Sequence, residues 1–255
     1  PLPPTTVTTD PKGMATNGTS LYLVVDGDPK DKILVLSTNP GQILNSYDAP
    51  GDNTTALAWH NGSLYAVTNE FHPTRGQQPP RVFKLNPSTG AVLEQFDIRA
   101  PWGGTLGGEA GGLASDGSSL YVAMKNEGGS GWYRFNPATP NSNAVRTDTF
   151  STNITGFMTS FQSLEVAEAV SGSPRLLAGG YATREGPGNI PVVTRFNKAT
   201  GELLDLWEMG NAEIAGMAYI GTVLYLADAQ SETILATSLP ENIPETTTIG
   251  SYQAT

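Results

Sequence analysis

The stretch AGGLASDGSSLYVAMKNEG, residues 110–128, decides the fold, and GWYRFNPAT follows it at residues 131–139. Together they read as an apolar strand, an Asp-Gly turn, a second apolar strand, a short loop, an aromatic strand and an Asn-Pro turn. Asp-Gly between two apolar segments is a strong hairpin signal, and the later proline cannot donate to a strand ladder. The stretch therefore predicts three consecutive antiparallel strands.

The same order of elements occurs five times along the chain. Each copy starts at a small residue, here called its anchor, and the anchors lie 43 to 56 residues apart. They are Gly13, Ala56, Gly112, Ser163 and Gly216. A third strand is expected in each copy, at residues 33–36, 82–85, 132–135, 193–196 and 234–237. A more polar fourth strand follows, as at residues 92–96 and 202–207.

Four short antiparallel strands repeated at a near-constant period are typical of a β-propeller. Five such units use up the 255 residues, so we predict an all-β fold in which residues 1–255 form a single five-bladed propeller of four-stranded blades. The expected blades cover approximately residues 10–50, 51–98, 109–150, 160–209 and 213–255. The alternative for such a strand-rich chain is an open β-sandwich.

Composition narrows the classes of function. The chain has no cysteine, which excludes disulfides, zinc–thiolate sites and thiol catalysis. The net charge of −10 argues against nucleic acid as a partner, and no apolar run is long enough to predict a membrane span. Low charge, many small polar residues and a Pro-Thr-rich start resemble secreted or cell-surface prokaryotic propellers. We therefore expect an extracellular or cell-surface location, with both ends reading as linkers or edge strands next to neighbouring modules or copies of a longer assembly.

The two faces of the predicted propeller differ in the length of their loops. One face, here called lower, carries tight turns such as Asn17-Gly18, Asn61-Gly62 and Asp116-Gly117. The loops expected on the opposite, upper face are longer and more varied, as at residues 69–81, 99–109 and 181–191. Long loops on a rigid scaffold usually carry function. The upper face is therefore the predicted functional face.

A ring of polar residues is predicted at the upper mouth of the central channel. These residues precede the anchors by three positions, and they are Asp10, Asn53, Glu109, Ser160 and Glu213. Carboxylate and amide oxygens suit a divalent cation such as Ca²⁺, and a cation would relieve repulsion between the carboxylates. The alternative is a polar cap that bonds only to water and main-chain groups. The candidate metal ligands are Glu109, Glu213, Asn53 and Asp10.

A second candidate site gathers aromatic and basic residues of the upper loops. It consists of Phe71, His72, Arg75, Arg81, Trp102, Tyr181 and Arg184. Exposed aromatic rings and arginines suit stacking and forked hydrogen bonds, and they indicate a glycan or protein partner. The alternative is that Trp102 and Tyr181 hold the loops against the blades.

Signals of catalysis are weak. No Ser-His-Asp order, nucleophile elbow or metalloprotease motif occurs, and His60 precedes a lower turn. Glu109 and Glu165 could form an acid/base pair across the channel. We therefore favour a secreted or surface-displayed module for binding, adhesion or structure, which recognises a glycan, a peptide or a partner protein. The alternative is a hydrolase, lyase or cyclase acting at the channel mouth.

The Leu-Tyr hairpins and the RFNPAT turn at residues 134–139 resemble the broad superfamily of NHL-, YncE- and WD40-like propellers. This resemblance covers essentially the whole chain, but its motifs are structural and imply a blade without a particular chemistry. Plant-type glutaminyl cyclases also have five blades and similar strand patterns. Their active-site stretches have no match here, so the resemblance does not imply their activity.

Overall fold

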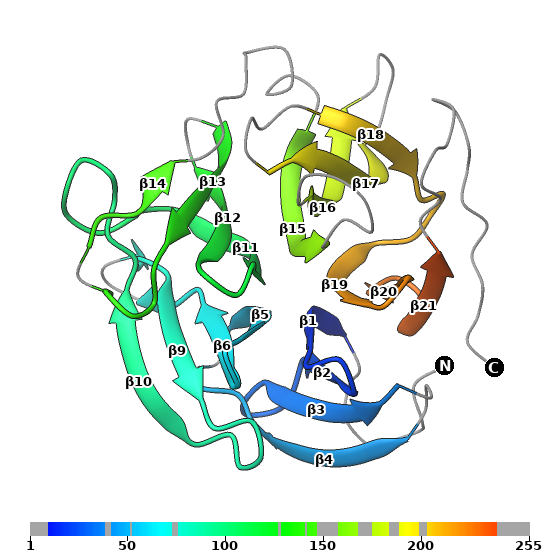
Figure 1. The fold of residues 1–255 in the computed structure, drawn as a ribbon, viewed down its shortest axis with the longest axis horizontal. Helices are drawn as coiled ribbons and strands as arrows, with labels where there is room; N and C mark the ends of the chain where they lie inside the picture. Colours follow the sequence, from blue (N-terminus) through cyan, green and yellow to red (C-terminus); the bar gives the residue numbers. More distant parts are fainter. Residues whose placement is uncertain are drawn as a thin grey trace.

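The computed structural model describes residues 10–38, 42–51, 53–72, 76–126, 129–140, 142–146, 158–167, 175–183, 189–198 and 203–238. Within them the chain forms five blades, each an antiparallel sheet, arranged around a central axis, and one additional two-stranded ribbon (Figure 1). The predicted all-β fold with five blades is confirmed. In the described part of the chain, no helix is long and apolar enough to cross a membrane.

Blades 1 to 3 each contain four described strands. Blade 1 runs β1 (Pro11–Thr16), β2 (Ser20–Val25), β3 (Lys32–Ser37) and β4 (Ile43–Asp48). Blade 2 runs β5 (Thr54–His60), β6 (Ser63–Thr68), β9 (Arg81–Leu85) and β10 (Val92–Asp97), with the small ribbon β7 (Phe71–His72) and β8 (Gly76–Gln77) between β6 and β9. Blade 3 runs β11 (Glu109–Ser115), β12 (Leu120–Asn126), β13 (Gly129–Phe135) and β14 (Val145–Arg146).

Blades 4 and 5 complete the ring. Blade 4 runs β15 (Met158–Ala167), β16 (Arg175–Thr183), β17 (Asn189–Asn197) and β18 (Leu203–Glu208). Blade 5 has three described strands, β19 (Ile214–Ile220), β20 (Val223–Asp228) and β21 (Thr233–Ser238). All five third strands predicted from the sequence are present.

The first strand of every blade lies next to the axis, and β19 of the last blade packs on β1 of the first, so the ring closes. The anchors explain how closely these inner strands approach. A Cβ atom added to Gly13 would lie 2.6 Å from the Cα of Ala56, and one added to Gly112 would lie 2.7 Å from the main-chain nitrogen of Leu164. Main chain therefore packs directly on main chain around the axis.

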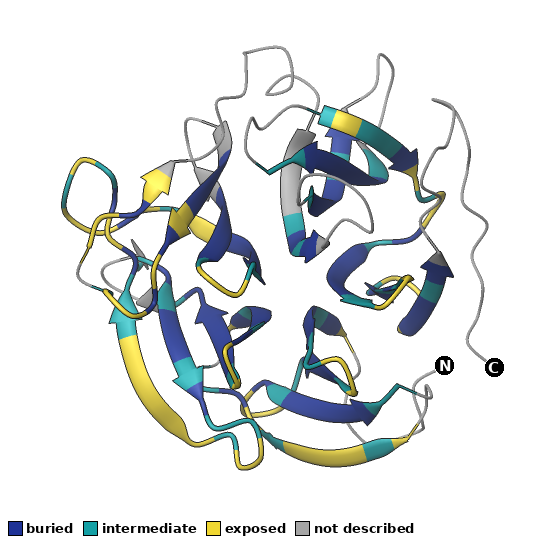
Figure 2. Cartoon of the chain, in the orientation of Figure 1, coloured by how far each residue is buried: buried dark blue, intermediate teal, exposed yellow. Residues whose placement is uncertain are grey.

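The core is divided among the interfaces between neighbouring blades. Strands near the axis are almost wholly buried, whereas the outermost strands β4 and β10 are largely exposed (Figure 2). The tyrosine of each Leu-Tyr motif packs into the interface with the next blade, and these are Tyr22, Tyr65, Tyr121 and Tyr225. The repeated motif thus makes four similar interfaces from similar residues.

Candidate functional site at the channel mouth

The inner strands share an irregularity at their upper ends. Each of them carries a β-bulge directly before its anchor, so that one residue has no partner on the second strand. A bulge bends its strand and re-aims the extra side chain. The five bulged residues are Lys12, Thr55, Gly111, Gln162 and Ala215.

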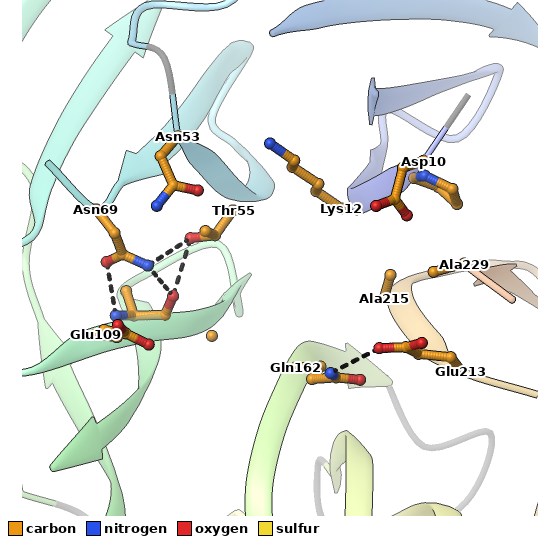
Figure 3. A pocket seen from close by; sticks show the side chains of 13 residues that line it. Asp10, Lys12, Asn53, Thr55, Asn69, Glu109, Gln162, Glu213, Ala215 and Ala229 are labelled. Atoms are coloured by element: carbon orange, nitrogen blue, oxygen red, sulfur yellow. Dashed lines mark hydrogen bonds between the residues drawn. The ribbon is translucent and has the colours of Figure 1, made fainter. Parts of the chain in front are cut away.

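All five bulged residues line one cavity of about 280 Å³ at the upper end of the channel. Asp10, Asn53, Glu109 and Glu213, which precede the anchors by three positions, line the same cavity, as Figure 3 shows. The structure therefore brings together four of the five residues that the sequence placed in a ring. The side chain of Ser160, the fifth, lies outside the described residues, and Gln162 is the residue of blade 4 that lines the cavity.

The bulges change which side chains of the inner strands face the channel. Regular alternation would turn a residue three positions before the anchor to the opposite side of the strand from the anchor. The strand is not regular there, because the bulge intervenes. The sequence analysis therefore missed the bulged positions, above all Lys12 and Gln162. The visible signal was Lys12 itself, a charged residue directly before the small anchor residue Gly13.

The cavity wall between blades 1 and 2 is held by a charged pair. Asp31 is 1% exposed, and its carboxylate accepts hydrogen bonds from Lys12 Nζ at 2.9 Å and from the main-chain nitrogen of Thr54 at 2.8 Å. Lys12 Nζ also lies 3.0 Å from Asp26 Oδ1. Burial opposes the charge on Lys12, but its bonds to both aspartates outweigh burial and raise its pKa. Lys12 thus stays charged beside the cavity while its ammonium group is already paired.

The wall between blades 2 and 3 is held by a neutral side chain. The amide of Asn69 donates to the main-chain oxygen of Ala110 at 2.8 Å and accepts from the nitrogen of the same residue at 2.8 Å. Thr55 Oγ1 donates to the oxygen of Ala110 as well, at 2.9 Å. Asn69 therefore acts as a clamp across the interface, and it is a residue that the sequence analysis did not single out.

Glu213 is the hub of the wall between blades 4 and 5. Its Oε1 accepts a hydrogen bond from Gln162 Nε2 at 3.2 Å, and its carboxylate also bonds to the hydroxyl of Tyr181. Burial, followed by the negative charge of Glu213, raises the pKa of Tyr181, so its phenol remains a donor at neutral pH. The predicted binding residue Tyr181 thus contacts the predicted metal ligand Glu213.

The mouth carries excess negative charge. Burial raises the pKa of Asp10, and the nearby charges of Asp26 and Glu213 raise it further, while Lys12 lowers it. Among the described residues that line the cavity, Lys12 is the sole basic one. Several carboxylates in a concave site focus a negative potential. The arrangement therefore favours a positively charged group in the cavity.

The described residues contain no group of three acidic or histidine side chains close enough to hold a metal ion. The calcium site predicted from the sequence accordingly stays a prediction. A calcium ion prefers six to eight oxygen ligands. At this mouth those would include Asn53 and main-chain or water oxygens beside the carboxylates.

The second predicted set does not gather in one place within the described chain. Arg81 pairs with Asp97 at 3.2 Å at the outer edge of blade 2, whereas Tyr181 contacts Glu213 beside the axis. Trp102 is 72% exposed, so it does not hold its loop against the blades. Arg75 and Arg184 lie outside the described residues, as do the side chains of Phe71 and His72 in the ribbon of β7 and β8.

Trp102 stands on an ordered hairpin between blades 2 and 3. Arg99 and Thr105 form a β-bridge, and Leu106 donates to the main-chain oxygen of Ile98 at 2.8 Å. Ile98, Ala100 and Leu106 are buried beneath it. The hairpin therefore presents an exposed indole ring from a fixed base.

His60 and Glu165, the other residues considered for catalysis, both lie in contacts between neighbouring blades. His60 is buried at the lower end of blade 2, and its Nδ1 lies 2.8 Å from Ser115 Oγ of blade 3. Glu165 does not line the cavity with Glu109, since its carboxyl group accepts a hydrogen bond from the main-chain nitrogen of Tyr219 in blade 5. The structure thus does not assemble the acid/base pair of Glu109 and Glu165.

No protein-family model matches the sequence, and no curated protein matches it. Many solved structures share the fold at low sequence identity. A structure titled as a bifunctional GH43-CE from Bacteroides eggerthii matches with a TM-score of 0.58 and 13% identity, covering 96% of this chain and 35% of that chain. Myxococcus xanthus glutaminyl cyclase matches with a TM-score of 0.54 and 13% identity, covering 88% of each chain. A chain of a nidogen/laminin complex matches with a TM-score of 0.53 and 14% identity, covering 91% of this chain and 77% of that chain.

The chain is a five-bladed β-propeller. The predicted five-bladed propeller fold is confirmed, and the solved structures share this fold without showing a specific family. These similar structures include a protein from a protein–protein complex as well as an enzyme, so the fold alone does not select between binding and catalysis.

Proposed function

We propose that this propeller is a binding module, secreted or displayed at a cell surface, whose upper face receives a peptide or protein partner. The channel mouth takes a basic group of that partner, such as the side chain of a lysine or arginine. The single observation that carries the proposal is the cavity of about 280 Å³ that is lined by the three carboxylates of Asp10, Glu109 and Glu213. Sites of this kind are usually concave and contain a few polar groups that fix the ligand's orientation.

The state of each carboxylate supports a cationic ligand over a neutral glycan. Glu213 is fixed by Gln162 and Tyr181, so it is oriented before the ligand arrives. Asp10 and Glu109 are exposed at the mouth and are free to swing toward an incoming cation. Lys12 is engaged by Asp26 and Asp31, and its charge lowers the pKa of Asp10 less than Asp26 and Glu213 together raise it, so the mouth keeps its negative charge.

A peptide array tests the proposal. We expect the labelled protein to bind peptides centred on lysine or arginine, and to bind the same sequences less well when the central residue is alanine or acetyl-lysine. Glu213→Gln combined with Asp10→Asn should weaken this binding about tenfold or more, since a hydrogen bond to a charged group contributes roughly 1.5–3 kcal/mol.

Glu94→Gln is the matched control for that double variant, because Glu94 is an exposed carboxylate on the outer strand β10. This control should bind like the wild type. Binding that is equal for lysine, acetyl-lysine and alanine peptides, or unchanged in the double variant, would contradict a basic ligand at the mouth. If the protein were retained only on neutral glycans, the ligand would be a glycan and not a peptide.

An enzyme acting at the mouth is the second candidate, and one observation favours it. Asp10 is a carboxyl group in a cavity whose pKa is raised by burial and by neighbouring charge. Perturbed acids in clefts are common at active sites. A hydrolase and lyase screen in which turnover disappears in both Glu109→Gln and Asp10→Asn would select this candidate over the binding module.

Calcium is an alternative occupant of the same cavity. If it binds there, the melting temperature should be higher in calcium chloride than in EDTA, because a ligand held only by the folded state stabilises that state. Glu213→Gln should abolish this difference. Equal melting temperatures of the wild type in both buffers would remove calcium from the proposal and leave the basic group.

A further inference from the structure

The interface between blades 4 and 5 departs from the other four in one cross-strand row. Two residues after each anchor the inner strand carries alanine in four blades, and the paired residue on the second strand is the tyrosine of the Leu-Tyr motif. These pairs are Ala15 with Tyr22, Ala58 with Tyr65, Ala114 with Tyr121, and Ala218 with Tyr225. In blade 4 the pair is Glu165 with Leu177.

The exchange places a carboxyl group in an apolar interface. Leu177 packs in the core cluster between blades 4 and 5 with Ile214 and Met217, and Glu165 shares its face of the blade. The Glu165 side chain keeps some exposed surface, but its carboxyl group is enclosed. It accepts one hydrogen bond, from the main-chain nitrogen of Tyr219 across the interface. The small alanine and large tyrosine of the other blades are thus replaced by a long acid and a smaller leucine.

The charged groups around Glu165 do not neutralise it. Arg195 is the next polar residue along the same row, and it is occupied by an ion pair with Asp205 and by the ring of Trp207, whose centroid lies 5.4 Å from its guanidinium carbon. From blade 5 the titratable groups on the facing strands are the phenols of Tyr219 and Tyr225 and, at the upper end of β20, the carboxyl group of Asp228.

In the interface between blades 3 and 4, Lys198 is paired with Asp116 at 2.6 Å. Burial raises the pKa of Glu165 to about 8, and only the Tyr219 nitrogen opposes this.

The same interface reaches the channel mouth. Gln162 lies three residues before Glu165 on β15, and it donates to Glu213 of blade 5. Ser163 Oγ lies 3.5 Å from the main-chain oxygen of Ile214. The contacts from Glu165 at one end to Gln162 at the other therefore join β15 to β19 and to Glu213, the residue directly before β19.

We propose that the interface between blades 4 and 5 is a proton-sensitive contact, closed while the Glu165 carboxyl is protonated and loosened when it ionises, so that β15 and β19 separate first of all the inner strands. This inference does not depend on what binds at the mouth. Loosening would displace Glu213 relative to Gln162, and it would thereby lower the affinity of the cavity for its ligand at alkaline pH.

The sign follows from proton linkage. The folded state holds the Glu165 proton up to about pH 8, while the unfolded or opened chain releases it near its ordinary value of 4.5. Between these values the folded state binds more protons, so stability falls as pH rises and levels off above about pH 8. Burial lowers the pKa of His60, which has the opposite effect and acts below pH 6.5. Comparison with a variant at Glu165 cancels this second contribution.

Glu165→Gln is the first test, because glutamine keeps an acceptor for Tyr219 and cannot ionise. From pH 5 to 8, we expect the folding equilibrium constant of the wild type to fall roughly tenfold per pH unit relative to the variant. Amide exchange, corrected for its intrinsic pH dependence, should show the same loss of protection in β19 and a smaller loss in β5. The control Glu94→Gln removes an exposed acid of blade 2, and its pH dependence should follow that of the wild type.

The inference is overturned if Glu165→Gln and the wild type have the same pH dependence, or if β5 and β19 lose protection equally. A carbon-13 titration of the wild-type glutamate side chains provides a test that needs no stable variant. We expect one carboxyl to titrate near pH 8, whereas titration of every glutamate between about pH 3.5 and 5.5 overturns the inference.

Discussion

The interface between blades 2 and 3 and that between blades 4 and 5 are built on the same plan but are held differently. Between blades 2 and 3, Ala58 and Tyr65 fill the row, and Asn69 clamps Ala110 above it. Between blades 4 and 5, Glu165 and Leu177 occupy that row. Above it, Glu213 accepts hydrogen bonds from Gln162 and Tyr181. From this difference we expect closure of the ring to depend on main-chain fit at the anchors, and the strength of each interface to depend on its polar groups.

Among the changes that test this comparison, Gly112→Val should have the largest effect on the free energy of unfolding. A Cβ atom at residue 112 would lie 2.7 Å from the nitrogen of Leu164, which is main chain and cannot rotate away. Overpacking of this kind costs about 3 kcal/mol or more, because blades 3 and 4 must separate. Urea denaturation measures the loss. Gly107→Ala is the control, since no atom lies within 4 Å of a Cβ there, and an equal loss in both variants would refute the main-chain fit.

Asp31→Ala should have the next largest effect, at the interface of blades 1 and 2. The change leaves the Thr54 nitrogen without its acceptor and Lys12 with Asp26 alone. We expect a loss of about 2–3 kcal/mol in the free energy of unfolding, below the value for a fully buried pair because Lys12 is partly exposed.

Asn69→Ala removes the neutral clamp between blades 2 and 3, and it should cost about 1–2 kcal/mol. The Asp31 effect should shrink in 1 M salt while the Asn69 effect does not, since only the former involves charge. Equal salt dependence of the two variants would contradict the distinction between a charged and a neutral clamp.

The double change Glu165→Ala with Leu177→Tyr rebuilds the row of the other blades in blade 4. It should raise the free energy of unfolding at pH 8 by about 2–3 kcal/mol more than at pH 6, because an enclosed carboxyl that ionises in this range is removed. Thermal melting at pH 6 and pH 8 measures it. The gain should be larger at pH 8, and a gain independent of pH would mean that packing alone distinguishes the two interfaces.

Trp102→Ala should have the smallest effect on stability, under about 0.5 kcal/mol, because the indole ring is exposed. Its effect on partner binding is a separate measurement. If Trp102 belongs to the binding face, the peptides retained by the wild type should bind the variant less tightly at unchanged melting temperature. A large drop in melting temperature would show that the ring supports its hairpin.

The sequence predicted the blades well because hairpin turns and Leu-Tyr strands are local signals. It also identified Asp10, Asn53, Glu109 and Glu213 as residues of the mouth. It could not reveal the bulges, since an extra residue in a strand depends on pairing with the neighbouring strand and leaves the local pattern intact. For the same reason it did not predict that Gln162 of blade 4 lines the cavity.

Contacts between blades were the least predictable part. The bond of Asn69 to Ala110 joins residues 41 positions apart, and the bond of Gln162 to Glu213 joins residues 51 positions apart. Neither follows from composition or spacing within a single blade. Glu165 and Leu177 take the places of alanine and tyrosine in the fourth copy, and this correspondence becomes visible only in the cross-strand register.

The bulges have a consequence for how such a protein can change during evolution. A bulged residue has no cross-strand partner, so its side chain can be exchanged without repacking the core behind it. One such position per blade faces the same cavity, and at present these hold a lysine, a threonine, a glycine, a glutamine and an alanine. Lys12, Thr55 and Gln162 also bond across the cavity wall, whereas Gly111 and Ala215 have no polar side chain, so changes at these two positions can give related propellers new ligands while the bonds between blades stay in place.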